Sequence, residues 1–348
     1  MEDFDLFFVC AFLLPVFFMA VLVRLKKKHS NASVQRSEVI VWNLVLLFFL
    51  VSGLFLGGES YFRFMVDTTD SFALNKFTKR WSKRYYRKNN FGVRDNVDYN
   101  YLIPPGKRRL TIIGDSFTAG HGIKKVDERF GNLLREQFPE IEIHILGING
   151  FETIDELNRM SKILSEGYQL DIVLLGYCLN DITYLIPEAK EIYERMAEFD
   201  ENLGFLARNS YFINTLAFRA MARKDSNVTN YYGFLKDKYQ DQSWLQHKAV
   251  LLDLKKTVEN SGGTLSVMTI PFLNNLNKYD FDQAHSTLDS FWRDEQVSHM
   301  DLLPLLKNES GSNLVVNQYD AHPNEEAHQL MANALNPFVK LQLQKTAQ

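Results

Sequence analysis

The chain of 348 residues has only two cysteines, Cys10 and Cys178, and carries little net charge. Two cysteines this far apart exclude the dense disulfide framework that stabilises small secreted domains. A net charge of −3 at pH 7 gives no sign of the basic surface that nucleic-acid binding requires, so we expect no nucleic-acid partner. The length is ample for a large hydrophobic core.

Several kinds of functional site are also missing from the sequence. No group of His, Cys or carboxylate residues has the spacing of metal ligands, and no Gly-rich phosphate loop or dinucleotide fingerprint occurs. The Gly-x-Ser-x-Gly turn of the α/β-hydrolases is absent as well. We therefore expect neither a metal nor an organic cofactor.

Hydrophobic residues are abundant, at 46% of the chain, and many of them lie before residue 60. Leu6 to Val23 and Val39 to Gly57 are apolar runs long enough to cross a bilayer as helices, and membrane helices tolerate a proline such as Pro15. The first five residues lack the positive charge of a cleaved signal peptide. These features predict a transmembrane hairpin over residues 1–58, in contact with the lipid bilayer through residues 6–57, rather than two buried core helices.

The flanking charges predict how this hairpin is oriented. Its connecting loop is basic, whereas the segment before the first run is acidic; the basic residues are Arg24, Lys26, Lys27, Lys28 and Arg36. Positive loops stay in the cytoplasm, so both ends of the hairpin should lie outside. We therefore expect a protein of the cell inner membrane whose remaining chain is periplasmic or extracellular.

Residues 59–107 form a basic and aromatic lead-in. Its basic residues are Lys76, Lys79, Arg80, Lys83, Arg84, Arg87, Lys88 and Arg94, and Phe77, Trp81, Tyr85 and Tyr86 lie between them. Most such runs are solvated faces of a protein. The interleaved aromatic residues also allow contact with an anionic lipid surface or an acidic polymer.

From residue 108 the sequence alternates between strand and helix patterns. The predicted strands are Leu110–Ile113, Ile141–Leu146, Asp171–Leu175, Thr264–Ile270 and Val297–Leu302, and the predicted helices include Glu128–Gln137, Ile154–Leu164 and Glu325–Leu343. This alternation predicts a parallel five-stranded sheet with helices on both faces. Residues 187–262 have helical patterns without a strand, which we interpret as an inserted helical subdomain or lid.

The first predicted strand ends abruptly at Gly114-Asp115-Ser116, which places Ser116 where a strand passes into a helix. In open α/β sheets, ligands bind at this carboxyl edge. A serine there is often only a helix N-cap, and its hydroxyl becomes a nucleophile only with a base beside it. The sequence must therefore supply a base from elsewhere.

Polar segments follow other predicted strands and should meet at the same edge. They begin at Gly147, at Gly176 and, after the fifth strand, at Asp320. His322 is the candidate general base, because a neutral imidazole titrates near working pH. Asp320, two residues earlier, can hold the other ring N–H and fix the tautomer.

Taken in order, Gly-Asp-Ser-Phe from Gly114, a glycine about thirty residues later, Gly-x-x-x-Asn-Asp from Gly176 and Asp-x-His-Pro from Asp320 resemble the four blocks of the SGNH (GDSL) hydrolase family. The last block is often Asp-x-x-His in that family. The resemblance covers residues 108 to about 340, and Asn90-Phe-Gly-Val-Arg-Asp95 resembles a lead-in of membrane-anchored bacterial members. It implies a flavodoxin-like three-layer α/β/α sandwich, here over residues 108–348.

The resemblance also implies a role for individual residues. Ser116 would be the nucleophile, with His322 and Asp320 completing a triad. The oxyanion hole would comprise the backbone N–H groups of Ser116 and Gly150 and the side chain of Asn180, with Gly147 as the alternative to Gly150. Asp115 and Asp181 would brace the loops, and Cys178 is expected to be a small core residue rather than a competing nucleophile.

These expectations together predict a membrane-anchored serine esterase that removes small acyl groups, acetyl above all, from a cell-envelope polysaccharide or glycan. The same residues would serve an O-acyltransferase that needs a membrane partner among the envelope polysaccharide assembly proteins. A lipid-directed esterase or lysophospholipase would use the basic lead-in at the membrane surface. A non-enzymatic scaffold is disfavoured because every catalytic position holds a competent residue.

Overall fold

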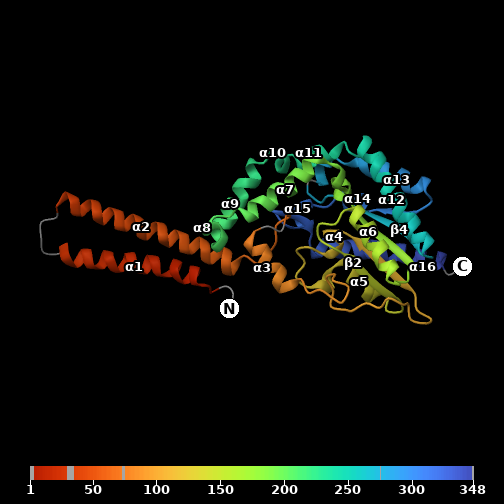
Figure 1. The fold of residues 1–348 in the computed structure, drawn as a ribbon, viewed down its shortest axis with the longest axis horizontal. Coiled ribbons are helices and arrows are strands. Elements are labelled where there is room, and N and C mark those ends of the chain that lie inside the picture. Colours follow the sequence, from red (N-terminus) through yellow and green to blue (C-terminus); the bar gives the residue numbers. More distant parts are fainter. Residues whose placement is uncertain (1–3, 30–34, 73–74, 275, 347–348) are drawn as a thin grey trace. The chain divides into compact units, whose positions relative to one another are not determined.

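The computed structural model describes residues 4–29, 35–72, 75–274 and 276–346 (Figure 1). The first three residues of the predicted hairpin and residues 30–34 of its loop thus lie outside the described residues. The chain forms two compact units. The hairpin unit comprises the described residues of 1–67, 73–80 and 196–225, and the sheet unit comprises 68–72, 81–195 and the described residues of 226–348.

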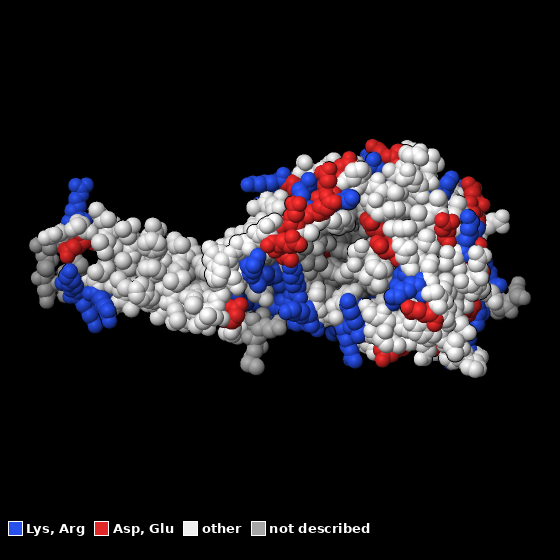
Figure 2. All heavy atoms as spheres, in the orientation of Figure 1, with Lys and Arg blue, Asp and Glu red and all other residues white. Residues whose placement is uncertain are grey.

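Two long apolar helices dominate the hairpin unit, α1 (Leu6–His29) and α2 (Arg36–Ser60), and a π-helix, η1 (Tyr61–Met65), continues the second. The mean hydropathy of the apolar stretch is 2.9 within Leu6–Lys28 and 2.6 within Arg36–Met65. Only 11% of the first stretch and 6% of the second are buried. A pair of core helices would bury its apolar side chains, whereas these expose them. In the described chain, two helices are thus long and apolar enough to cross a membrane. Figure 2 shows their charged side chains gathered near the loop end.

The carboxyl end of α2 packs on α9 (Tyr211–Lys224) within the hairpin unit. Glu59 is fully buried there, forms an ion pair with Arg63 at 2.8 Å and accepts a hydrogen bond from the Ser210 hydroxyl at 2.6 Å. A charge can be buried only when it is paired and hydrogen-bonded, and these contacts satisfy Glu59. Part of the predicted insert, residues 196–225, therefore packs with the hairpin helices rather than as a lid of its own.

The sheet unit contains five parallel strands in the order β2-β1-β3-β4-β5, namely β1 (Arg109–Gly114), β2 (Glu142–Gly147), β3 (Ile172–Cys178), β4 (Thr264–Ile270) and β5 (Ser298–Asp301). Every residue of β1 and β3 is buried, as expected for parallel strands covered on both faces. The predicted α/β fold class with a five-stranded parallel sheet is confirmed.

Strand order determines where the helices lie. The connection from β1 to β2 crosses the sheet in one direction, and the connections from β2 to β3 and from β3 to β4 cross it in the other. Since such crossovers are right-handed, α5 (Phe130–Gln137) covers one face, while α6 (Thr153–Ser165) and α12 (Gln242–Asn260) cover the opposite face. α6 and α12 pack against each other, as do α5 and α16 (Glu325–Lys345). The result is the predicted three-layer sandwich.

The remaining elements of the chain are short or connect these layers. They are α3 (Lys76–Tyr85), α4 (Ser116–Ala119), η2 (Val126–Glu128), η3 (Leu179–Leu185), α7 (Pro187–Glu201), α8 (Phe205–Asn209), α10 (Ser226–Thr229), α11 (Tyr231–Lys236), η4 (Leu276–Lys278), α13 (Asp282–Asp294), α14 (Leu303–Leu306), α15 (Gly311–Leu314), β6 (Val315–Asn317) and β7 (Asp320–Pro323).

Two predictions need correction. Residues 187–262 are helical as expected, but their last helix, α12, packs on α6 and β4 and is therefore a layer of the sandwich, not part of an insert. The final polar segment does not directly follow a strand of the main sheet. Instead β6 and β7 form a separate antiparallel pair, and Asp320 and His322 lie on β7.

The basic lead-in contributes to the interior as well as to the surface. Arg94 is buried in the sheet unit and donates to the carbonyls of Gly120 and Ile123, in the loop that follows Ser116. Asp95, also buried, pairs with Arg135 at 2.7 Å. The segment that resembles a family lead-in thus fixes a loop next to the predicted nucleophile. Arg80 is also buried, whereas five other basic residues are exposed, namely Lys79, Lys83, Arg84, Arg87 and Lys88. Figure 2 shows Lys and Arg side chains gathered over α3.

Candidate active site

Ser116 lies at the first position of α4, directly after β1. A Cβ on Gly114 would come within 2.2 Å of the Thr118 hydroxyl oxygen, so only glycine permits this tight strand-to-helix turn. Asp115, not Ser116, is the N-cap of the helix, because its carboxylate accepts from the backbone N–H of Phe117 at 2.8 Å. The Ser116 hydroxyl is therefore not used as a cap.

The structure brings Ser116, His322 and Asp320 together in one hydrogen-bonded chain. His322 Nε2 lies 2.7 Å from Ser116 Oγ, and His322 Nδ1 lies 2.5 Å from Asp320 Oδ1. Residues two apart on a strand point to the same face, so the Asp-x-His spacing on β7 places both side chains side by side. Because a carboxylate only accepts, Nδ1 carries the proton and Nε2 offers its lone pair to the serine hydroxyl.

Burial and charge set the electrostatics of this chain. Burial opposes ionisation of Asp320, which is 1% exposed, but the neighbouring His322 outweighs that effect and holds the pKa of Asp320 well below its usual value. Burial likewise favours the neutral ring of His322, yet the charge and hydrogen bond of Asp320 outweigh it and raise the pKa of His322. The site therefore stabilises the imidazolium that proton abstraction would create.

The predicted oxyanion donors lie in the turns after β2 and β3. Asn180, at the start of η3, donates from Nδ2 to Asp115 Oδ2 at 3.3 Å, so Asp115 orients the amide beside the serine. Gly150 is exposed and has φ +78°, a left-handed conformation that favours glycine. Gly147 instead allows close packing, because a Cβ there would come within 2.4 Å of the backbone nitrogen of Ala119.

Three buried carboxyl groups lie behind these turns. Asp115 accepts from Asn180 as described above, and Asp181 accepts from the backbone N–H of Cys178 at 3.2 Å. Glu156 on α6 was not predicted, and among the described residues neither of its carboxyl oxygens has a hydrogen-bond partner. Burial, followed by mutual repulsion, raises the pKa of both Glu156 and Asp181. Burial also raises the pKa of the Cys178 thiol, which agrees with a core role for that residue.

Sequence reasoning also missed a second histidine, His121, whose ring centre lies 4.6 Å from that of His322. Its Nε2 is 3.5 Å from Asp320 Oδ2, and burial lowers the pKa of His121 to about 4, so the ring is neutral. His121, Asp320 and His322 have ligand-type atoms within 4.8 Å of one another, although hydrogen bonds within the site already engage these atoms. Their distance along the sequence hid this cluster, since it comes from the fold alone.

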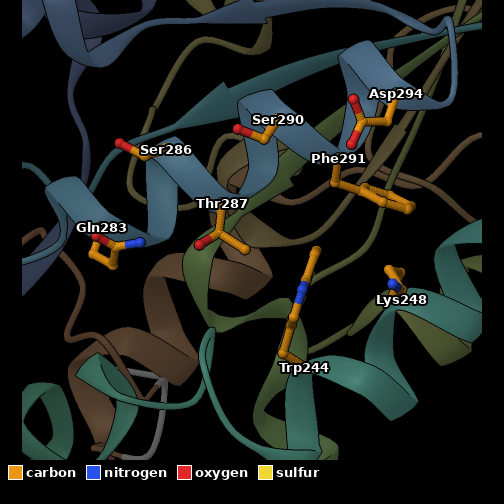
Figure 3. Close-up of a pocket in the computed structure, with 8 residues that line it drawn as sticks. All are labelled: Trp244, Lys248, Gln283, Ser286, Thr287, Ser290, Phe291 and Asp294. Carbon is orange, nitrogen blue, oxygen red and sulfur yellow. The ribbon is translucent and has the colours of Figure 1, made fainter.

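A separate cavity lies away from these residues, between α12 and α13 of the sheet unit (Figure 3). It has a volume of about 370 Å³, and the side chains of Trp244, Lys248, Thr287 and Asp294 are among those that line it. None of the predicted site residues belongs to it.

The fold and the site together give a parallel α/β protein with a hydrogen-bonded serine, histidine and aspartate at the carboxyl edge of its sheet. No family model and no curated protein matches the sequence. The five-stranded parallel sheet with helices on both faces is an α/β fold like that of the SGNH (GDSL) hydrolases, whose four blocks the sequence resembles.

Solved structures similar to the chain include lipolytic proteins and esterases. A lipolytic G-D-S-L protein from Veillonella parvula is 11% identical with a TM-score of 0.42, over 66% of this chain and 96% of that one. The psychrotrophic esterase EstA from Pseudoalteromonas is 16% identical with a TM-score of 0.42, over 68% and 100%. A two-domain esterase active on acetylated mannans is 14% identical with a TM-score of 0.36, over 77% and 52%.

Proposed function

We propose that this protein is a membrane-anchored serine esterase that removes small O-acyl groups, acetyl above all, from a cell-envelope polysaccharide or glycan. The observation that carries the proposal is the continuous hydrogen-bonded chain from Ser116 Oγ through His322 to Asp320, at 2.7 and 2.5 Å. A serine hydroxyl, a correctly oriented imidazole and a buried carboxylate are the parts that acyl transfer requires.

In the first half of the proposed reaction, Ser116 Oγ attacks the ester carbonyl while His322 Nε2 takes the hydroxyl proton. Asp320 stabilises the resulting imidazolium, and its hydrogen bond keeps the ring in place. The oxyanion would accept hydrogen bonds from the backbone N–H groups of Ser116 and Gly150 and from Asn180 Nδ2. His322 then returns the proton to the leaving sugar oxygen, and the carbon–oxygen bond to the sugar breaks, which leaves Ser116 acylated.

In the second half, His322 removes a proton from water, and the hydroxide attacks the acyl carbonyl. The bond to Ser116 breaks, the serine regains its proton from His322, and the carboxylic acid leaves. If a sugar hydroxyl replaces water, the same steps make the enzyme an O-acyltransferase. Ser116 is partly exposed, so an acceptor can reach it from solvent.

The membrane location supports an envelope substrate. The two apolar helices fit a bilayer anchor over residues 6–57, and their basic loop favours the cytoplasm, which would place the sheet unit on the periplasmic or extracellular side of the inner membrane. We infer from this placement that the acyl ester belongs to a polysaccharide or glycan of the envelope. Polysaccharide assembly proteins of the envelope are the partners we expect there.

This proposal is tested by comparing the wild type with Ser116→Ala, each as the full chain in detergent. The wild type should hydrolyse p-nitrophenyl acetate and react with a fluorophosphonate probe, and the variant should lose both, with turnover falling at least ~1,000-fold, because Ser116 Oγ is the hydroxyl that contacts His322 Nε2. Ser286→Ala, a serine on α13 outside the site, is the matched control. Esterase activity that survives in Ser116→Ala would refute the mechanism.

A substrate panel separates the alternatives. Preference for acetylated oligosaccharides over long-acyl lipid esters supports the glycan esterase, and the reverse preference indicates a lipid-directed enzyme. Acetylated product that forms only when a membrane acyl-donor protein is coexpressed indicates an acyltransferase.

A further inference from the structure

Residues 68–72, which we call the strap, follow the second apolar helix closely in the sequence and pack on the β6–β7 pair of the sheet unit. The backbone N–H of Ser71 donates to the carbonyl of Tyr319 at 3.1 Å, and the hydroxyl of Ser71 accepts from the N–H of Ala321 at 3.1 Å. Asn317 donates to the carbonyl of Thr69 at 3.0 Å. Hydrogen bonds in both directions thus fix the strap to the strand pair that carries the catalytic dyad.

Within the strap, the hydroxyl of Thr69 donates to Asp320 Oδ2, and both residues are buried. Asp320 Oδ1 accepts from His322 Nδ1, so the two carboxylate oxygens have different partners. A buried carboxylate that lacks a partner on one oxygen is costly and free to rotate. The Thr69 hydroxyl therefore fixes which oxygen faces His322, together with the backbone N–H of His322, which donates to Asp320 Oδ1 at 3.1 Å.

His121 reinforces this contact from the loop after α4. Its Nδ1 accepts from the Asn149 side-chain amide at 2.9 Å, so the proton lies on Nε2. That N–H points to the carbonyl of Asp70 in the strap at 3.2 Å and lies 3.5 Å from Asp320 Oδ2. Because the ring is neutral, it supplies a donor to the strap without adding a charge that would compete with His322 for Asp320.

We propose that Thr69 is a positioning residue of the active site, whose hydroxyl holds Asp320 in the orientation that His322 needs. The inference rests on the proposed esterase function. It makes the segment directly after the membrane anchor part of the catalytic apparatus, with His121 as the link between strap and triad.

The expected consequence of removing the hydroxyl concerns both rate and proton affinity. Without Thr69, Asp320 rotates and the Asp–His geometry is held less often, which lowers kcat. Besides Asp320, the charged groups that act on His322 are Asp115 and Asp70, and the His121 ring is neutral. In the molecules that keep the Asp320–His322 contact, the carboxylate has lost the donor that shared its negative charge and attracts the imidazolium proton more strongly, so the ring should become protonated at a higher pH.

The test compares Thr69→Val with Thr69→Ser in the full-length protein. We expect Thr69→Val to lower kcat about 10-fold or more, to change KM less than about 2-fold, and to shift the acid limb of the kcat/KM profile to higher pH. Thr69→Ser keeps the hydroxyl and should restore both. Thr257→Val, on α12 outside the strap and the site, is the matched control.

Activity is expressed per site labelled by the fluorophosphonate probe, which removes the effect of misfolded protein. Equal kcat and an unchanged pH profile in Thr69→Val would overturn the inference, as would a loss of rate that Thr69→Ser fails to restore. If Thr69→Val does not fold, Thr69→Ala takes its place in the same comparison with Thr69→Ser. An inactive, unlabelled wild type would instead refute the proposed function, so the two failures are distinct.

Discussion

At the scale of single residues, Asp320 and His322 shift each other's pKa: the carboxylate raises that of the imidazole, and the imidazole lowers that of the carboxylate. The two residues are close in sequence, and β7 places their side chains on one face, so an Asp-x-His spacing achieves a 2.5 Å contact. The residues that support this pair could not be predicted in the same way. Thr69 and His121 reach Asp320 only through the fold, and neither belongs to a sequence block that marks a role.

Asp320→Asn tests the pair directly. An amide can donate to His322 Nδ1 and reverse the tautomer, so we expect kcat to fall by a factor on the order of 1,000 to 10,000. Because the charge of Asp320 raises the pKa of His322 against the effect of burial, its loss should also move the acid limb of kcat/KM to lower pH. In the wild type that limb should lie above pH ~6.5, the usual value for histidine, with activity lost as the pH falls through it.

The measurement is the pH dependence of kcat/KM for the residual activity of Asp320→Asn. Asp289→Asn, which alters a carboxylate that contacts His299 outside the site, is the control and should leave the profile unchanged. An acid limb that stays in place in Asp320→Asn would show that Asp320 does not set the proton affinity of His322.

At the scale of elements, the sheet was predictable and the last strand pair was not. The first four strands are mainly apolar, and burial on both faces is what makes such segments recognisable. β6 and β7 are short and half polar, so their residues lack a strand pattern. The helical period of α12 was clear, but periodicity does not say which element a helix packs on, and its place in the sandwich was therefore missed.

Gly147→Ala tests how the end of β2 supports α4. A Cβ at this position would lie 2.4 Å from the backbone nitrogen of Ala119 and 2.6 Å from the carbonyl carbon of Thr118, so backbone must move. We expect a loss of about 1–3 kcal/mol in unfolding free energy, together with reduced kcat because α4 carries Ser116. Thermal or denaturant unfolding measures the first effect. Gly204→Ala, where a Cβ meets nothing within 4 Å, should change neither quantity.

At the scale of the whole molecule, the chain divides into two units that interleave along the sequence. Residues 196–225 lie in the hairpin unit, while the strap and residues 81–195 lie in the sheet unit. Hydropathy identified the two apolar helices, but which later segments pack with them depends on buried contacts such as Glu59 with Ser210. A sequence pattern carries no sign of such long-range pairs.

The two native cysteines make membrane orientation easy to test. Cys178 is buried with a raised thiol pKa, and Cys10 lies within an apolar helix, so both should react poorly with a membrane-impermeant maleimide. In intact cells we expect Asp253→Cys, an exposed position on α12, to be labelled after the outer envelope is permeabilised. Lys28→Cys, at the loop end of α1, should be labelled only after lysis. The opposite pattern would reverse the proposed orientation.

The position of the strap also constrains how this enzyme can be detached from its anchor. A soluble version cut within residues 66–67 keeps Thr69 and the contacts of Ser71 with the β6–β7 pair. A version that starts at residue 75 retains the four sequence blocks that resemble the SGNH hydrolases and the whole five-stranded sheet. It lacks Thr69, whose hydroxyl donates to Asp320 Oδ2. Proteolytic shedding on the two sides of this five-residue segment would thus release two forms that share the five-stranded sheet but differ in activity.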